Sequence, residues 1–168
     1  DAGEHTMTLY SFSKAYGLAS WRVGYMVVPE HLFESVMKIQ DTNVICAPAI
    51  SQHAALACLQ VGSAYCRGHL EEFAEVRQLV LDALHSLGDL VTVPMARGAF
   101  YVYVKVRRPI DSSDLVQRLI AEHKVAVIPG SAFGSADGCY LRVSYGALRP
   151  SRVREGIGRL VAGLEQIR

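Results

Sequence analysis

Several features are scarce in this sequence of 168 residues, and each scarcity excludes a class of protein. No stretch reaches the roughly 18 consecutive apolar residues that a membrane-spanning helix needs. The opening residues contain neither a basic cluster nor an apolar run, so we expect neither membrane insertion nor an attached secretion signal. An excess of one charge is also lacking, because 17 Lys and Arg residues balance 16 Asp and Glu residues to a net charge of +1. Nucleic acids and anionic membrane surfaces are therefore not expected as partners.

Cysteine is scarce as well. The chain has four cysteines and no CxxC pair; they are Cys46, Cys58, Cys66 and Cys139. This spacing argues against both a zinc knuckle and a disulfide framework, and it predicts reduced thiols in a cytoplasmic protein. His53 and Cys58 lie five residues apart, which is only a weak metal-binding pattern, so we expect no metal site.

The hydrophobic content of 51% is sufficient for a core, and its periodicity predicts the elements of the first half. In order, we expect a strand over 7–10, a loop over 11–21, a strand over 22–28 and a helix from Pro29. A helix over 49–61 is expected to pack through a face formed by Ile50, Ala54, Ala57, Cys58 and Val61. One long helix is expected over 63–87, with an apolar stripe formed by Leu70, Phe73, Val76, Val80, Ala83, Leu84 and Leu87.

The second half has a different pattern, in which apolar and polar residues alternate as in half-buried antiparallel strands. The expected elements are strands over 90–94 and 99–106, a helix capped by Asp111, strands over 125–128 and 139–145, and a helix from Pro150 through Ile167. This order, β-β-α-β-β-α, predicts an α+β domain.

The residues most suggestive of chemistry surround Lys14. Two hydroxyls precede it, those of Ser11 and Ser13, and Arg22 follows eight residues later. Fully extended, Lys14 and Arg22 would lie about 26 Å apart, but Gly17 permits a turn that brings them together. Hydroxyls and a guanidinium suit a phosphate group. An adjacent lysine suits a carbonyl carbon, with which it forms a Schiff base, so the pattern indicates a phosphorylated carbonyl cofactor.

The run SFSKAYGLASWRVGY over 11–25 resembles the cofactor-lysine segment of fold-type I, pyridoxal-phosphate-dependent class I/II aminotransferases. The small residues before Lys14, and the Arg, apolar residue and Gly at 22–24, fit that pattern. Ser20 departs from it, because the family usually has Gly there. Three later segments also resemble the family: NVICAPAISQHAALACL, PMARGAFYVYVKV and VAVIPGSAFGSADGCYLRVSYG.

The resemblance implies an α/β, aspartate aminotransferase-like fold. Residues 1–85 would be the C-terminal part of the large cofactor domain and 86–168 a small α+β domain. Because the family places well over a hundred residues before its lysine, we expect a missing N-terminal portion, with Asp1 as a cut edge, and no transamination by these 168 residues alone. The complete protein would form a homodimer.

The resemblance also implies the site. Lys14 would hold pyridoxal 5′-phosphate as a Schiff base, and Ser11, Ser13 and Arg22 would anchor its phosphate. Arg142 would bind the α-carboxylate of the substrate. The implied reaction moves an amino group between an amino acid and a 2-oxo acid. An isolated arginine on an alternating strand is usually an outward-facing charge, but the lysine motif and the Gly-rich loop before Arg142 favour the binding role.

The same sequence pattern is compatible with other functions. Carbon–sulfur β-lyases and cyclopropane-carboxylate synthases share much of the same pattern. A non-catalytic structural module is a further alternative. Ser11 to Lys14 is also an SxxK sequence, the nucleophile signature of penicillin-binding proteins and class A β-lactamases, but the supporting SDN and KTG sequences are absent.

Overall fold

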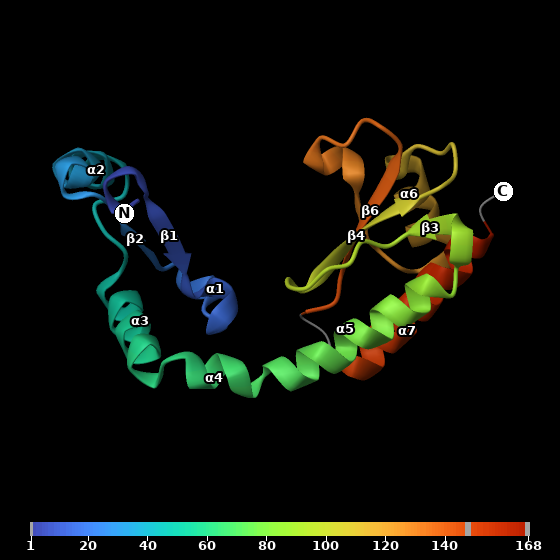
Figure 1. Cartoon of the computed structure of the whole chain (residues 1–168), viewed down its shortest axis with the longest axis horizontal. Helices are drawn as coiled ribbons and strands as arrows, with labels where there is room; N and C mark the ends of the chain where they lie inside the picture. Colours follow the sequence, from blue (N-terminus) through green and yellow to red (C-terminus); the bar gives the residue numbers. More distant parts are fainter. Residues whose placement is uncertain (1, 147–148, 167–168) are drawn as a thin grey trace. The chain divides into compact units, whose positions relative to one another are not determined.

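The computed structural model describes residues 2–146 and 149–166. It contains two compact units, Asp1–Leu70 and Glu71–Arg168 (Figure 1). Each unit has its own hydrophobic core and is described by itself. Asp1 and Ile167 lie outside the described residues, so the expectations placed on them stay predictions. Among the described residues, no helix is both long and apolar enough to cross a membrane.

The first unit is built on a two-stranded antiparallel hairpin. Its elements are η1 (Gly3–His5), β1 (Thr8–Ser11), α1 (Phe12–Ala15), η2 (Ala19–Trp21), β2 (Gly24–Val27), α2 (Glu30–Asn43), α3 (Ala49–Val61) and α4 (Ser63–Gly68). β1 and β2 pair from Thr8 opposite Val27 to Ser11 opposite Gly24. Both expected strands are confirmed, and the expected loop between them contains the short helices α1 and η2.

The core of this unit is small and consists of Phe12, Val23 and Ala55, with partly buried neighbours. Helix α3 has the predicted bounds, but its predicted packing face is only partly right, since Cys58 packs against the core whereas Val61 is exposed. Ser51 and Ala55 are buried, whereas Ile50 is 66% exposed. The Ser51 hydroxyl donates a hydrogen bond of 2.9 Å to the carbonyl oxygen of Trp21, and this bond turns the Ser51 side of the helix inward.

The long helix expected over 63–87 is two helices, α4 and α5 (Leu70–His85). The break follows Gly68, because glycine costs about 1 kcal/mol relative to alanine inside a helix. Val76, Val80 and Leu84 of α5 are buried in the core of the second unit. For this reason the compact units divide at 70 and 71, and not at the domain boundary of 85 expected from the sequence. The assignment of domains in the complete protein stays a prediction.

The second unit has the predicted β-β-α-β-β-α order. After α5 come η3 (Gly88–Leu90), β3 (Val91–Thr92), β4 (Tyr101–Val106), α6 (Ser112–His123), β5 (Ile128–Pro129), η4 (Gly130–Phe133), β6 (Cys139–Ser144) and α7 (Pro150–Glu165). The four strands form an antiparallel sheet in the order β3-β4-β6-β5. Asp111 caps α6 as predicted, because its Oδ1 accepts hydrogen bonds from the backbone N–H groups of Ser113 at 2.8 Å and Asp114 at 3.2 Å.

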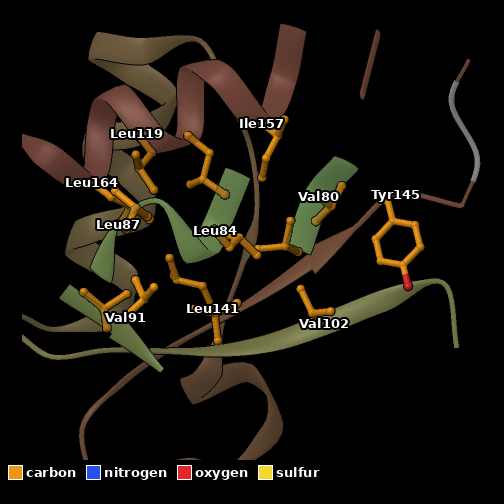
Figure 2. Packing of buried hydrophobic residues seen from close by; sticks show 14 of the residues in the cluster. Val80, Leu84, Leu87, Val91, Val102, Leu119, Leu141, Tyr145, Ile157 and Leu164 are labelled. Atoms are coloured by element: carbon orange, nitrogen blue, oxygen red, sulfur yellow. The ribbon is translucent and has the colours of Figure 1, made fainter. Parts of the chain in front are cut away.

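One face of this sheet carries the core. Val102 on β4 and Leu141 on β6 pack with Val80 and Leu84 of α5, while α6 and α7 contribute apolar residues such as Leu119 and Ile157 (Figure 2). Because side chains alternate along a strand, the residues between these core positions lie on the opposite face. That opposite face carries the candidate site of this unit.

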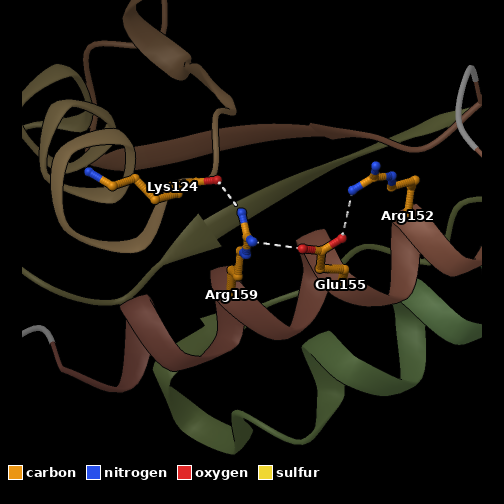
Figure 3. A network of polar contacts seen from close by, with 4 residues as sticks. All are labelled: Lys124, Arg152, Glu155 and Arg159. Atoms are coloured by element: carbon orange, nitrogen blue, oxygen red, sulfur yellow. Dashed lines mark hydrogen bonds and ion pairs between the residues drawn. The ribbon is translucent and has the colours of Figure 1, made fainter.

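Helix α7 is also held by polar contacts (Figure 3). Glu155 accepts hydrogen bonds from Arg159 at 2.6 Å and from Arg152 at 3.1 Å. Arg159 in turn donates to the carbonyl oxygen of Lys124, the left-handed residue that ends α6, at 3.1 Å. The network therefore joins α7 to the C-terminus of α6.

Candidate functional site

The lysine segment forms a tight turn between β1 and β2. Ser11 ends β1 and is the N-cap of α1, with its hydroxyl oxygen accepting a hydrogen bond of 3.1 Å from the backbone N–H of Ser13. This capping explains why a helix begins here, since serine side chains satisfy the free N–H groups of a first helical turn. Lys14 lies in α1 and is exposed to solvent.

The turn returns the chain to its starting point, as the sequence predicted. Gly17 has a φ of +67°, and Arg22 has a φ of 50°, so both adopt left-handed backbone conformations. The N–H of Phe12 then donates to the carbonyl oxygen of Val23 at 3.4 Å, and Ser11 pairs with Gly24 across the hairpin. The backbone of Arg22 therefore lies beside the beginning of α1, although eight residues separate it from Lys14.

Gly24 is required for this arrangement. A Cβ atom at position 24 would lie far inside the contact distance of the carbonyl oxygen of Tyr10, on the paired strand. The rings of Tyr10 and Tyr25 stack with their centroids 4.7 Å apart, which further holds the two strands together. The glycine of the Arg-Val-Gly sequence thus has a physical role, because it allows the close pairing that fixes Arg22.

The donor set of the turn fits a phosphorylated aldehyde. The Ser11 oxygen accepts one hydrogen bond and can still donate through its O–H, and Ser13 adds a second hydroxyl. Arg22 uses Nη1 to bind the carbonyl oxygen of Ala19 at 3.1 Å, which orients the guanidinium and leaves other N–H groups for an anion. Lys14 belongs to the same turn, and its amine together with these groups matches the carbonyl and the phosphate of pyridoxal phosphate.

Two residues of α4 that the sequence did not indicate, Cys66 and Tyr65, also support this turn. Cys66 of α4 donates from Sγ to the carbonyl oxygen of Ala15 at 3.3 Å. Burial, with the nearby Cys66 thiol, raises the pKa of the Tyr16 hydroxyl. The rings of Tyr16 and Tyr65 stack at 6.0 Å. No sequence signal points to these contacts, because they join positions about fifty residues apart.

Arg142 lies in the second unit, on the face of β6 opposite the core. Its guanidinium carbon is 4.4 Å from the ring centroid of Tyr101 and 5.3 Å from that of Phe133. Its Nε atom is buried and has no hydrogen-bond partner among the described residues. No carboxylate of the described chain pairs with it. A half-buried guanidinium without an acid partner is suited to an external carboxylate.

The residues around Arg142 were not predicted as site residues. Tyr101 and Tyr103 alternate with the buried valines of β4, so the strand pattern alone places both on the face of Arg142. Tyr103 stacks on Tyr140 with centroids 5.3 Å apart. Phe133 comes from η4, and only the folded structure shows that this turn lies against the sheet.

The five predicted site residues thus occupy two places. Ser11, Ser13, Lys14 and Arg22 lie in one turn of the first unit, whereas Arg142 lies in the second. Within the described part of the chain, no group of three or more His, Cys, Asp and Glu residues is placed to hold a metal ion.

The chain is similar to known aminotransferases along nearly its whole length. Residues 1–160 match the family Aminotransferase class I and II, so the chain belongs to this family, which generally depends on pyridoxal phosphate. It is 37% identical to aromatic aminotransferase ISS1 of Arabidopsis thaliana over 98% of its own length, which is 42% of the relative. It is 35% identical to an aspartate aminotransferase of Thermotoga maritima over 89% of its length, which is 37% of that relative.

The fold agrees with this membership. The crystal structure of an aromatic aminotransferase from Pyrococcus horikoshii matches 98% of the chain with a TM-score of 0.87 and 30% identity, over 44% of that structure. The aspartate aminotransferase-like fold expected from the sequence is therefore confirmed. The chain spans about two fifths of the length of these relatives. The family match places Ser11 in an aminotransferase and not in a penicillin-binding protein or a β-lactamase.

Proposed function

We propose that this chain is the C-terminal part of an aminotransferase that moves an amino group between an amino acid and a 2-oxo acid. The observation that carries the proposal is the closed turn between β1 and β2. There the pairing of Ser11 with Gly24 brings the backbone of Arg22 beside the helix that carries Lys14. The membership of the family supports the same reaction.

The turn would hold the phosphate of pyridoxal phosphate through the hydroxyls of Ser11 and Ser13 and the guanidinium of Arg22. A guanidinium stays charged at every physiological pH, so Arg22 would anchor the phosphate dianion throughout the reaction. When bound, pyridoxal phosphate supplies an aldehyde that condenses with amines and a ring that withdraws electrons from the substrate Cα.

Lys14 would have two roles at its Nζ atom. First, the amine would hold the cofactor covalently at this turn. Second, the same Nζ would serve as the base that takes the proton from the substrate Cα and as the acid that gives a proton back. Lys14 suits this second role because a lysine amine can be both a base and an acid.

Arg142 would bind the α-carboxylate of the substrate. Within the described part of the chain no carboxylate pairs with its guanidinium, whose planar shape matches a carboxylate through two parallel hydrogen bonds. Fixing the carboxylate fixes the direction of the Cα–H bond, which places the proton in reach of a base.

The proposal is tested in the full-length protein with a panel of amino donors, measuring the 2-oxo acid produced. The panel includes aromatic amino acids and aspartate, because the two relatives described above are an aromatic aminotransferase and an aspartate aminotransferase. We expect Lys14→Ala to abolish turnover and Arg142→Ala to raise the KM for the amino acid about 100-fold, as expected for loss of a charge-assisted pair. Arg118→Ala, which removes an exposed ion pair on α6, is the control. Unchanged turnover in Lys14→Ala would contradict the proposal.

The panel also distinguishes related reactions. A carbon–sulfur β-lyase releases a thiol, ammonia and pyruvate, and a cyclopropane-carboxylate synthase forms a ring without a 2-oxo acid. The proposal includes a homodimer in the cytoplasm, which size-exclusion chromatography and cell fractionation test directly. A membrane or secreted location, or a monomer with full activity, would contradict these parts of it.

A further inference from the structure

The aromatic rings around Arg142 indicate how its guanidinium is oriented, which deepens the proposed function and rests on it. Tyr101 lies diagonally from Arg142 across the β4–β6 pair, in which Tyr101 is opposite Ser144 and Tyr103 is opposite Arg142. Diagonal neighbours on one face of a sheet are within reach of aromatic side chains. Phe133 reaches the same guanidinium from η4.

The inner and outer nitrogens of the Arg142 guanidinium have different surroundings, and this difference matters for binding a carboxylate. The Nε atom of Arg142 is both buried and without a hydrogen-bond partner among the described residues. Neither Nη atom combines these two properties. The inner nitrogen is therefore shielded from solvent, the two rings lie against the guanidinium, and no hydrogen bond within the described residues uses its outer nitrogens. An aromatic face attracts a guanidinium from above its plane, and it leaves the N–H groups that point outward within that plane free of hydrogen bonds to the ring. The guanidinium is thus held while its Nη donors remain available for a carboxylate.

Phe133 is itself held by a hydrogen-bonded turn. The Tyr103 hydroxyl donates to the carbonyl oxygen of Gly130 at 3.4 Å and also forms a hydrogen bond with the Ser135 hydroxyl. These two bonds attach Tyr103 to both ends of the turn that contains Phe133. The Tyr103 ring also contacts Phe133 edge to face, with centroids 6.1 Å apart.

We infer that Tyr101 and Phe133 are positioning residues, which hold the Arg142 guanidinium in the orientation that binds the substrate carboxylate. Tyr103 acts one contact further out, since its hydroxyl keeps the turn of Phe133 in place. None of the three needs to touch the substrate for this role.

The first test measures kinetics in the full-length protein with two substrates, an amino acid and the matching amine without a carboxylate. Tyr101→Leu and Phe133→Leu remove one ring each and should raise the KM for the amino acid about 5-fold, with kcat nearly unchanged. The kinetics with the amine should not change. Tyr101→Phe keeps the ring and should behave like the unmodified protein. Equal losses with both substrates, or no loss with either, would overturn the inference.

Tyr103→Phe removes only the hydroxyl and should raise the KM for the amino acid about 2-fold to 3-fold through the loosened turn. The matched control is Tyr140→Phe, since Tyr140 stacks on Tyr103 on the same face but its hydroxyl makes no hydrogen bond among the described residues. Identical effects of the two variants would count against the role of Tyr103.

A second test does not depend on activity. In the NMR spectrum of the 168-residue chain, the two rings should shift the Nε–H resonance of Arg142 by their ring currents. Tyr101→Leu and Phe133→Leu should each move this resonance, and Tyr140→Phe should not. An unshifted resonance that neither leucine variant moves would refute the ring contacts. If the full-length protein does not transaminate, the proposed function fails while this second result still reports on the contacts.

Discussion

Replacing Gly130 with alanine should destabilise the second unit through a single methyl group. The new Cβ atom would lie 2.6 Å from Cβ of Tyr140, 2.8 Å from the Tyr103 hydroxyl oxygen and 3.0 Å from the Tyr140 carbonyl oxygen. Carbon atoms do not approach so closely, so the turn or β6 must move by several tenths of an ångström. Two of the three neighbouring atoms lie close to the rigid backbone of β6. Overpacking of this kind costs about 1–3 kcal/mol.

The matched control is Gly158→Ala on α7. An added Cβ atom at position 158 meets no atom within 4 Å outside the backbone of its own helix, among the described residues, and alanine favours a helix over glycine by about 0.5–1 kcal/mol. The two identical chemical changes should therefore have opposite effects on the free energy of unfolding. Urea denaturation of the chain, followed by circular dichroism, measures both. Equal midpoints for Gly130→Ala and the unmodified chain would refute the contact geometry around Gly130.

Three further predictions concern the second unit. Leu84→Ala, at a fully buried position, should lower the free energy of unfolding by about 2.5–5 kcal/mol in urea denaturation. Lys124→Gly relieves a left-handed φ of 55° and should stabilise the chain by roughly 0.5–1 kcal/mol; a loss of stability would show that the lysine side chain matters more than its backbone. Burial raises the pKa of the Cys139 thiol to about 11 from 9.0, with the negative charge of Asp111 adding to the shift. The folded chain keeps this proton up to a higher pH than the unfolded chain does. The thiol's contribution to stability should therefore be complete below pH 9 and be lost as the pH rises to about 11. Cys139 should also react with a thiol reagent far more slowly than the exposed Cys46.

The sequence predicted local features well. The cap at Asp111 and the bounds of α3 were both confirmed, because capping and helical periodicity depend on neighbouring residues. The turn at Gly17 was also predicted, since only glycine adopts its backbone conformation without strain. These signals lie within a few residues of the feature that they specify.

Features that depend on distant partners were not predicted. Apolar periodicity placed Ile50 inside, but the bond from Ser51 to Trp21, thirty residues away in the chain, turns another face of α3 inward. In the same way, Phe133 comes from a separate turn to contact Arg142. A pattern in the sequence shows which residues are apolar or charged, and the packing of separate segments decides what each one meets.

Reduction of the cofactor-loaded protein with borohydride, followed by peptide mapping, tests the central claim most directly. Borohydride makes the bond between a lysine and pyridoxal phosphate permanent, and the chain offers four lysines, Lys14, Lys38, Lys105 and Lys124. We predict that the label in the full-length protein is found on Lys14 and is lost in Lys14→Ala but not in Lys38→Ala. Label on another lysine of the chain, or full labelling after Lys14 is replaced, would contradict the assignment of the cofactor to the turn between β1 and β2.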